Sequence, residues 1–167
     1  MALPGRLVLN GADYAPLTFF GVGTFLAFSG NGIYRNQASA GSIKNDGPLP
    51  IGKYWIVERG VGGMGSWFKA AMQDSWNHYR WGATYRRDES CALYRDDRSI
   101  DDVTWINNVK RGLFRLHPGH VSEGCITIRH NSDYAAIRNA LMHTAPVRVP
   151  CMKSLLARGW IEVVANG

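Results

Sequence analysis

The segment from Leu116 to Ile128 contains the residue types that nucleophilic catalysis needs. His117 ends an alternating apolar run, and eight residues later Cys125 directly follows Gly124. A cysteine nucleophile needs a thiolate, an imidazole to receive its proton, and donors for the oxyanion. Because Gly124 has no Cβ, the backbone can bend sharply there and aim two amides at a substrate carbonyl. The spacing therefore indicates a cysteine–histidine site, although a cysteine on a buried strand gives the same pattern.

A zinc site is an alternative interpretation of the same segment. His117, His120, Cys125 and His130 offer ligands over fourteen positions, and a His-x-x-His pair can bind one metal ion. Structural zinc sites usually combine two close ligand pairs. Since Cys125 and His130 are separated along an expected strand and turn, we favour a site without metal.

Cys91 is the second candidate nucleophile, in the chain order of papain-like hydrolases. It follows the polar run Arg-Arg-Asp-Glu-Ser, without the turn-then-helix setting that lowers a thiol pKa. The three cysteines are odd in number, so at least one has no partner within the chain. A Cys91–Cys151 disulfide would leave Cys125 as the thiol in an oxidising compartment. Two buried thiols are the alternative.

Short strands and glycine-rich turns are expected to position these residues. The loop Asn45–Gly52 is rigid because two prolines fix its backbone. Asn131 or Ser132 can cap a helix that runs to about His143. Apolar or alternating runs predict strands at 6–9, 17–20, 24–28, 53–57, 112–117, 126–128, 147–149 and 160–164.

The middle of the chain differs in composition. A glycine-rich stretch precedes a predicted helix from about Ser66 to Tyr79, and residues 80–102 are polar, with weak strand content expected. No internal repeat or linker is visible. We therefore predict a single domain over 1–167 of the mainly β (α+β) class, with a helical insertion or lid at about 58–111.

Composition excludes disordered, collagen-like and coiled-coil classes, since 46% of the 167 residues are hydrophobic and 19% charged. The formal net charge is +6, from 19 Lys+Arg against 13 Asp+Glu, and arginine dominates. This favours an anionic partner or a plain basic surface. No nucleic-acid motif is present. The apolar stretch Phe19–Phe28 is too short for a membrane span, and no secretory signal is expected at the N-terminus.

Three motifs together resemble a known family. The run Ser122-Glu-Gly-Cys-Ile, preceded by His117, resembles the signature of L,D-transpeptidases of the YkuD fold, in which a histidine precedes a Ser/Thr-x-Gly-Cys turn. The segment Gly47–Tyr54 resembles that family's Thr-Pro-x-Gly-x-Phe/Tyr element, and Asn131–Tyr134 begins the helix expected after the cysteine. With Phe25–Gly30, these motifs more narrowly resemble peptidoglycan-targeting type VI secretion effectors. Glu at the second motif position and the short histidine–cysteine spacing depart from the wider family and agree with this branch.

The resemblance implies a β-sandwich or open barrel and a thioester mechanism. Cys125, as a thiolate beside protonated His117, would attack the carbonyl at the L-centre of meso-diaminopimelate in a tetrapeptide stem. The Gly124 and Cys125 amides would stabilise the oxyanion, and D-alanine would leave. Water would complete an L,D-carboxypeptidase reaction, a second stem's amine a transpeptidase reaction, and a free D-amino acid an exchange.

The resemblance also implies supporting residues and partners. Ser122 would hold the turn or contact the site, and His120 would support His117 or replace it as the base. Arg115 and Arg129 would pair the stem's carboxylates, unless they form surface salt bridges. No cofactor or metal is expected. The implied partners are peptidoglycan stem peptides, a cognate immunity protein and a secretion-system component. The protein is expected to be made in the cytoplasm and delivered to the target-cell periplasm.

Overall fold

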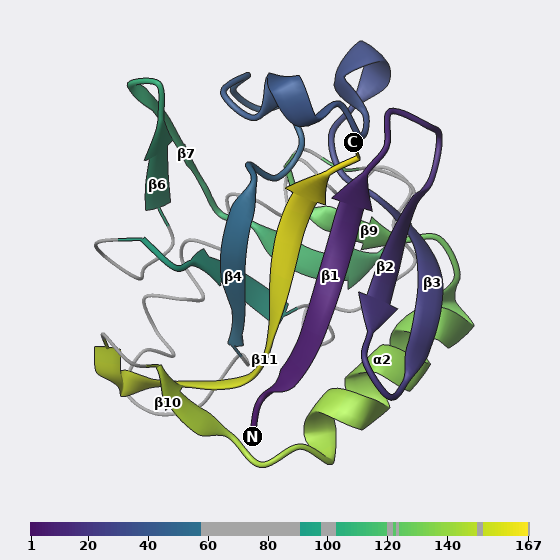
Figure 1. The fold of residues 1–167 in the computed structure, drawn as a ribbon, viewed down its shortest axis with the longest axis vertical. Helices are drawn as coiled ribbons and strands as arrows, with labels where there is room; N and C mark the ends of the chain where they lie inside the picture. Colours follow the sequence, from purple (N-terminus) through teal and green to yellow (C-terminus); the bar gives the residue numbers. More distant parts are fainter. Residues whose placement is uncertain (58–90, 98–102, 120–121, 123, 150–151, 167) are drawn as a thin grey trace.

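Eight strands of the described residues close into a β-barrel. The structure is a computed structural model, which describes residues 1–57, 91–97, 103–119, 122, 124–149 and 152–166. In ring order the strands are β1 (Leu3–Leu9), β2 (Ala15–Phe19), β3 (Gly23–Phe28), β9 (Ile126–Ile128), β8 (Arg115–Pro118), β5 (Cys91–Arg95), β4 (Gly52–Val57) and β11 (Met152–Ala165). A parallel pairing of β1 with β11 closes the ring, and β10 (Val147–Val149) pairs with β11 outside it (Figure 1).

Alternation of side chains along the strands builds the core. In β1, Leu7 and Leu9 are buried and Arg6 beside Leu7 is exposed, because successive side chains of a strand point to opposite faces. In the parallel pair β8–β9, Leu116 is opposite Ile126, and both belong to the main core cluster. The neighbouring positions of these two strands therefore belong to the opposite face of the sheet.

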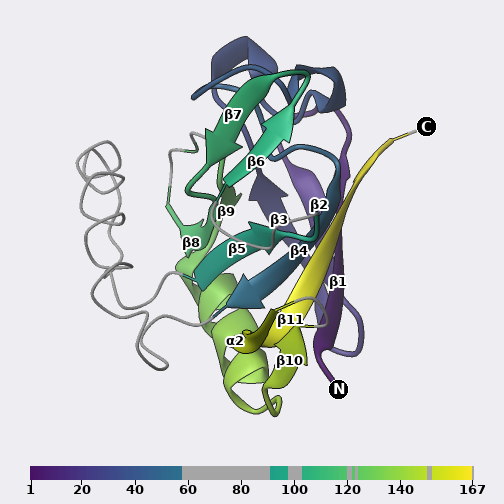
Figure 2. The same cartoon turned by 90° about the vertical axis from the view of Figure 1, so that its left-hand side faces the viewer.

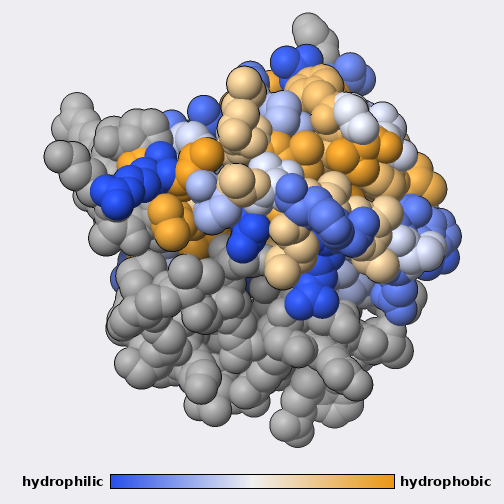
Figure 3. Space-filling view, turned by 90° about the horizontal axis from the view of Figure 1, so that it is seen from below, coloured by the Kyte–Doolittle hydropathy of each residue, from blue (hydrophilic) through white to orange (hydrophobic). Residues whose placement is uncertain are grey.

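The helix α2 (Asn131–Met142) packs against one end of the barrel (Figures 1 and 2). The helix predicted from Asn131 or Ser132 is confirmed, with His130 rather than either of these at the N-cap position. Seen from below, apolar and hydrophilic side chains are interspersed on the described surface at this end (Figure 3). The residues of α2 that join the barrel core are Tyr134, Ile137 and Leu141.

A hairpin outside the barrel interrupts one predicted strand. β6 (Val103–Ile106) and β7 (Val109–Gly112) pair through a turn at Asn107 and Asn108, whose φ values of +48° and +67° are typical of a tight hairpin turn. Leu113, with φ of +58°, then separates β7 from β8. The single strand predicted over 112–117 was therefore wrong, because the left-handed backbone at Leu113 breaks the pairing there.

The prediction of a mainly β fold is confirmed, with the barrel closed by the β1–β11 pair. The predicted helix at 66–79 lies outside the described residues. Within the expected insertion, Cys91–Arg95 form β5, a barrel strand between β4 and β8. No helix among the described residues is long and apolar enough to cross a membrane.

Candidate active site

Ser122 ties the turn before β9 to the loop after β3. Its hydroxyl donates to the Cys125 carbonyl oxygen at 2.7 Å and accepts from the Gly30 amide at 3.2 Å. Because Ser122 is buried, water does not readily replace these hydrogen bonds, and their loss would cost stability. Of the two roles that the resemblance implied for Ser122, the geometry accounts for holding the turn.

Only glycine fits at position 124 in this turn. Its φ is +91°, a conformation that other residues rarely adopt, and a Cβ there would lie 2.5 Å from Nη2 of Arg111. The ring of Phe114 and the carbonyl of Gly47 would be the next contacts, at 3.4 Å and 3.6 Å. The backbone therefore bends at Gly124 while packed against three other segments.

The thiol of Cys125 is buried next to a strained residue. Its Sγ lies 4.0 Å from the carbonyl oxygen of Leu113, as the donor of a weak hydrogen bond. Leu113 has φ of +58°, in the left-handed region that non-glycine residues seldom occupy. Such outliers are common near active sites, where the surrounding structure holds them.

His117 lies on the strand beside the Cys125 turn. The parallel register places His117 opposite Thr127, two residues after Cys125. Because side chains alternate along a strand and Leu116 faces the core, the side chain of His117 belongs to the opposite face. Cys125 lies in the bend directly before β9.

Burial keeps the imidazole of His117 neutral. The side chain is 2% exposed, and desolvation lowers its pKa to about 4, although the hydrogen bond to the Pro118 carbonyl acts in the opposite direction. Nδ1 lies 2.9 Å from that carbonyl oxygen and must donate to it, because a carbonyl only accepts. The proton of the neutral ring is therefore on Nδ1, and Nε2 is the basic atom. The resemblance implied a protonated His117 beside a thiolate, whereas burial favours the neutral ring.

Arg111, which sequence reasoning missed, connects the turn to a second loop. Its guanidinium is buried and donates to three carbonyls: Nη1 to Gly41 at 2.8 Å and to Pro48 at 2.6 Å, and Nη2 to Gly47 at 2.9 Å. In the sequence Arg111 belongs to a basic run that is typical of an exposed strand. The signal that could have found it is the proline-rich loop, since its carbonyls need donors from elsewhere.

The segment Gly47–Tyr54 is fixed at both ends. The Leu49 amide donates to the Ser29 hydroxyl at 2.7 Å, and the Tyr54 hydroxyl donates to the Pro50 carbonyl at 2.6 Å. Burial raises the pKa of Tyr54 well above its ordinary value, so the phenol stays protonated and remains a donor. The motif therefore provides a rigid wall beside the Gly124 turn.

The two other arginines occupy different surroundings. Arg115 is buried and donates from Nη1 to the Phe114 carbonyl at 2.8 Å. Arg129 is half-buried, and its guanidinium carbon lies 5.9 Å from the centre of the Tyr14 ring. His120, Cys151 and Glu123, which is the glutamate of the Ser-Glu-Gly-Cys run, lie outside the described residues.

Cys91 belongs to the barrel core. It is opposite Leu116 in the β5–β8 pair, and its Sγ lies 3.8 Å from the hydroxyl of Tyr134. This strand setting lacks the helix N-terminus that activates the cysteine of papain-like hydrolases. Cys91 carries a thiol in the structure, and Cys151, its expected disulfide partner, lies outside the described residues. In the described part of the chain, no three His, Cys, Asp or Glu side chains are grouped for a metal ion, and His130 is exposed.

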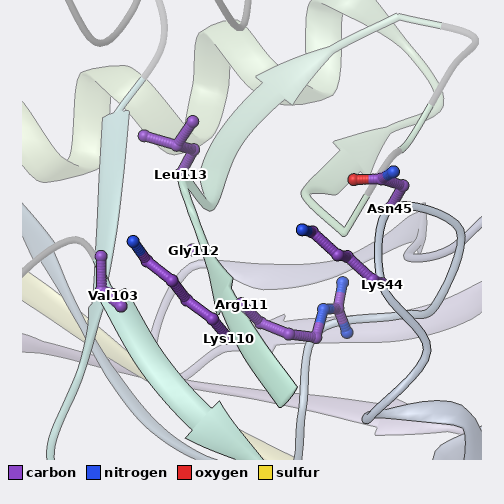
Figure 4. Close-up of a pocket in the computed structure, with 7 residues that line it drawn as sticks. All are labelled: Lys44, Asn45, Val103, Lys110, Arg111, Gly112 and Leu113. Atoms are coloured by element: carbon purple, nitrogen blue, oxygen red, sulfur yellow. The ribbon is translucent and has the colours of Figure 1, made fainter.

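A pocket of about 370 Å³ adjoins the turn (Figure 4). One side is the loop after η2 (Ala38–Ala40), which follows η1 (Gly32–Tyr34), and the other is the β6–β7 hairpin and the residue after it. The described residues that line it are Lys44, Asn45, Val103, Lys110, Arg111, Gly112 and Leu113.

Comparison with known proteins places the chain in a family. Residues 23–152, from β3 to the start of β11, match the family model described as the Tlde1 domain. No curated protein matches the chain. The matched range includes the Gly47–Tyr54 wall, His117 and the Ser122–Cys125 turn. The chain therefore belongs to the Tlde1 domain family, the L,D-transpeptidase-like effectors of type VI secretion.

Proposed function

We propose that this protein is a cysteine enzyme that cleaves or exchanges the terminal D-alanine of peptidoglycan tetrapeptide stems. The observation that supports the proposal is the parallel register of β8 with β9, in which His117 is opposite Thr127, two residues after Cys125 and the Gly124 bend. Family membership supports an effector of the peptidoglycan-modifying kind. The thioester reaction and its residues are our assignment.

The neutral His117 suits the role of general base. Nε2 accepts the thiol proton as Sγ of Cys125 bonds to the carbonyl carbon of the meso-diaminopimelate L-centre. The carbonyl oxygen becomes an oxyanion, towards which the Gly124 and Cys125 amides donate; losing one such donor costs about 10²–10³ in rate. The proton on Nε2 then passes to the amine of D-alanine as the C–N bond breaks and a thioester remains.

The second half of the reaction regenerates the thiol. Water, the amine of a second stem or a free D-amino acid gives up a proton to Nε2 and attacks the thioester carbonyl. The C–S bond breaks, and Sγ takes the proton back from His117. The three acceptors yield a tripeptide, a 3–3 cross-link and an exchanged tetrapeptide, respectively.

Muropeptides with tetrapeptide stems test this function directly. The purified protein should convert them to tripeptides, 3–3 dimers or, with added D-amino acid, exchanged stems, as read by chromatography and mass spectrometry. Cys125→Ala should abolish all three products. Cys91→Ala is the matched control and should retain them, because Cys91 lies in the core away from the turn. Activity lost with Cys91→Ala in a folded variant, but kept with Cys125→Ala, would favour the papain-like alternative.

Delivery and partners follow from the effector assignment. We propose that the protein is secreted into the periplasm of a target cell, where peptidoglycan stems are exposed, and that the producing cell makes an immunity protein. Periplasm-directed expression of the wild type should lyse or round cells, whereas Cys125→Ala and cytoplasmic expression should not. Equal toxicity of wild type and Cys125→Ala would separate toxicity from the thioester reaction.

A further inference from the structure

The pocket beside the turn shares residues with the candidate active site. Arg111 lines the pocket and also contacts Gly124, where a Cβ would lie 2.5 Å from its Nη2. Leu113 lines the pocket too, and its carbonyl oxygen lies 4.0 Å from Sγ of Cys125. Leu113 therefore belongs to the lining of the pocket and also contacts the thiol.

The pocket is cationic. Lys44 and Lys110 are carried by different segments, the loop after η2 and strand β7 (Figure 4). Among the described residues neither ammonium group has a carboxylate within ion-pair distance, and no Asp or Glu lines the pocket. Such a concentration of one sign attracts an anion.

The backbone that carries these groups is held in place. Asn45, next to Lys44, has φ of +69°, and the Lys44 carbonyl accepts from the Asp46 amide at 2.9 Å. On the opposite side, Lys110 belongs to a hairpin paired in register, with Trp105 opposite it. The site is therefore preorganised on two fixed segments rather than on one mobile loop.

We propose that Lys44 and Lys110 bind the free α-carboxylate of the residue that leaves during thioester formation. This inference rests on the proposed function. In a substrate with a terminal D-alanine, that carboxylate is three bonds from the carbonyl carbon that Sγ attacks, which suits a pocket that shares Leu113 with the surroundings of the thiol. Ammonium–carboxylate hydrogen bonds are stronger than neutral ones, and they would orient the scissile bond. The subsite selects tetrapeptides over stems whose carboxylate is blocked.

Kinetics on two substrates test the subsite. The substrates are a tetrapeptide muropeptide and the same molecule with its terminal carboxylate converted to a carboxamide. For the tetrapeptide, Lys44→Gln/Lys110→Gln should raise KM about tenfold and change kcat less than twofold. For the carboxamide, wild type and double variant should have the same low kcat/KM. Arg148→Gln removes one exposed positive charge on β10 and should leave both substrates unaffected.

Several outcomes would overturn the subsite. If the double variant lost kcat/KM equally on both substrates, the lysines would have a general effect and would not recognise the carboxylate. If it lost no kcat/KM on the tetrapeptide, the lysines would not bind the substrate. If Arg148→Gln lowered kcat/KM on the tetrapeptide as much as the double variant does, the effect would come from the net charge of the protein. If amidation of the meso-diaminopimelate side-chain carboxylate, rather than of the terminal one, removed the lysine dependence, the assigned carboxylate would be wrong.

A binding measurement separates this inference from the proposed function. Calorimetry with Cys125→Ala and the tetrapeptide should show binding that weakens about tenfold in the Cys125→Ala/Lys44→Gln/Lys110→Gln variant and recovers with arginine at both lysine positions. Lysine-dependent binding without turnover by the wild type would refute the thioester reaction and keep the subsite. The subsite would be refuted if the wild type turned over the tetrapeptide while the lysine substitutions left its affinity unchanged. It would also be refuted if the tetrapeptide did not bind.

Discussion

The guanidinium of Arg111 lies directly against the α-carbon of Gly124. The two residues belong to different segments, β7 and the turn before β9, and a Cβ on Gly124 would come within 2.5 Å of Nη2. Arg111 also bonds the carbonyls of Gly47 and Pro48. One buried side chain therefore sets the relative positions of the turn that holds Cys125 and the loop that walls it.

Gly124→Ala should destabilise the fold and impair catalysis. The variant combines an unfavourable φ with a clash against a buried, bonded guanidinium, so we expect the free energy of unfolding to fall by about 2–4 kcal/mol. Gly21→Ala is the matched control, since Gly21 has a similar φ of +86° but a Cβ there would meet no other atom within 4 Å. It should lose only about 1 kcal/mol. Equal losses in urea unfolding would mean that contact with Arg111 is unimportant.

Arg111→Gln should be among the most destabilising single changes near the site. It leaves the three buried carbonyls of Gly41, Gly47 and Pro48 short of donors, at about 1–3 kcal/mol for each group left unsatisfied. We expect a loss of about 3 kcal/mol or more, and a smaller loss for Arg111→Lys, which keeps the charge without the planar fork. Chemical denaturation measures both. A change within about 0.5 kcal/mol, the range of ordinary surface substitutions, would contradict the bridging role.

Stability should fall with acid because of His117. Its pKa is about 4 when folded against an ordinary 6.5. Between these values the unfolded chain binds a proton that the folded protein does not, so the free energy of unfolding decreases as pH falls, by about 1.4 kcal/mol per unit. Below about pH 4 this contribution is lost. His117→Gln removes the titration, so its stability should decline less steeply from about pH 7 to about pH 4.5. The free energy of unfolding is measured by urea denaturation at each pH. The same pH dependence in the wild type and His117→Gln would contradict a neutral, buried His117.

Ser122→Ala should loosen the turn that holds Cys125. The change removes a donor to the Cys125 carbonyl and an acceptor of the Gly30 amide in a buried place, so a loss of about 1–3 kcal/mol is expected, together with a lower kcat. Thr18→Ala removes an exposed side-chain hydrogen bond to Thr24 and should cost far less. Unchanged kcat with normal stability would show that the Ser122 bonds do not hold the turn.

The sequence by itself determined the local parts of this protein. The strands at 24–28, 53–57 and 126–128 and the helix after Asn131 follow from side-chain alternation and helical spacing, which depend only on near neighbours. The histidine, glycine and cysteine of the candidate site are close in the chain, so their spacing carried the catalytic interpretation. The sequence did not predict the strand break at Leu113, because a leucine gives no sign of a left-handed backbone.

Only the tertiary structure decided the properties that depend on distant segments. The β1–β11 pair joins the two ends of the chain and closes the barrel, which no local pattern encodes. Burial lowers the pKa of His117 to about 4, which favours the neutral imidazole. Packing also brought Arg111 against Gly124 and placed Lys44 and Lys110 around one pocket. Desolvation and charge proximity depend on which residues are neighbours in space, and local sequence patterns do not specify those neighbours.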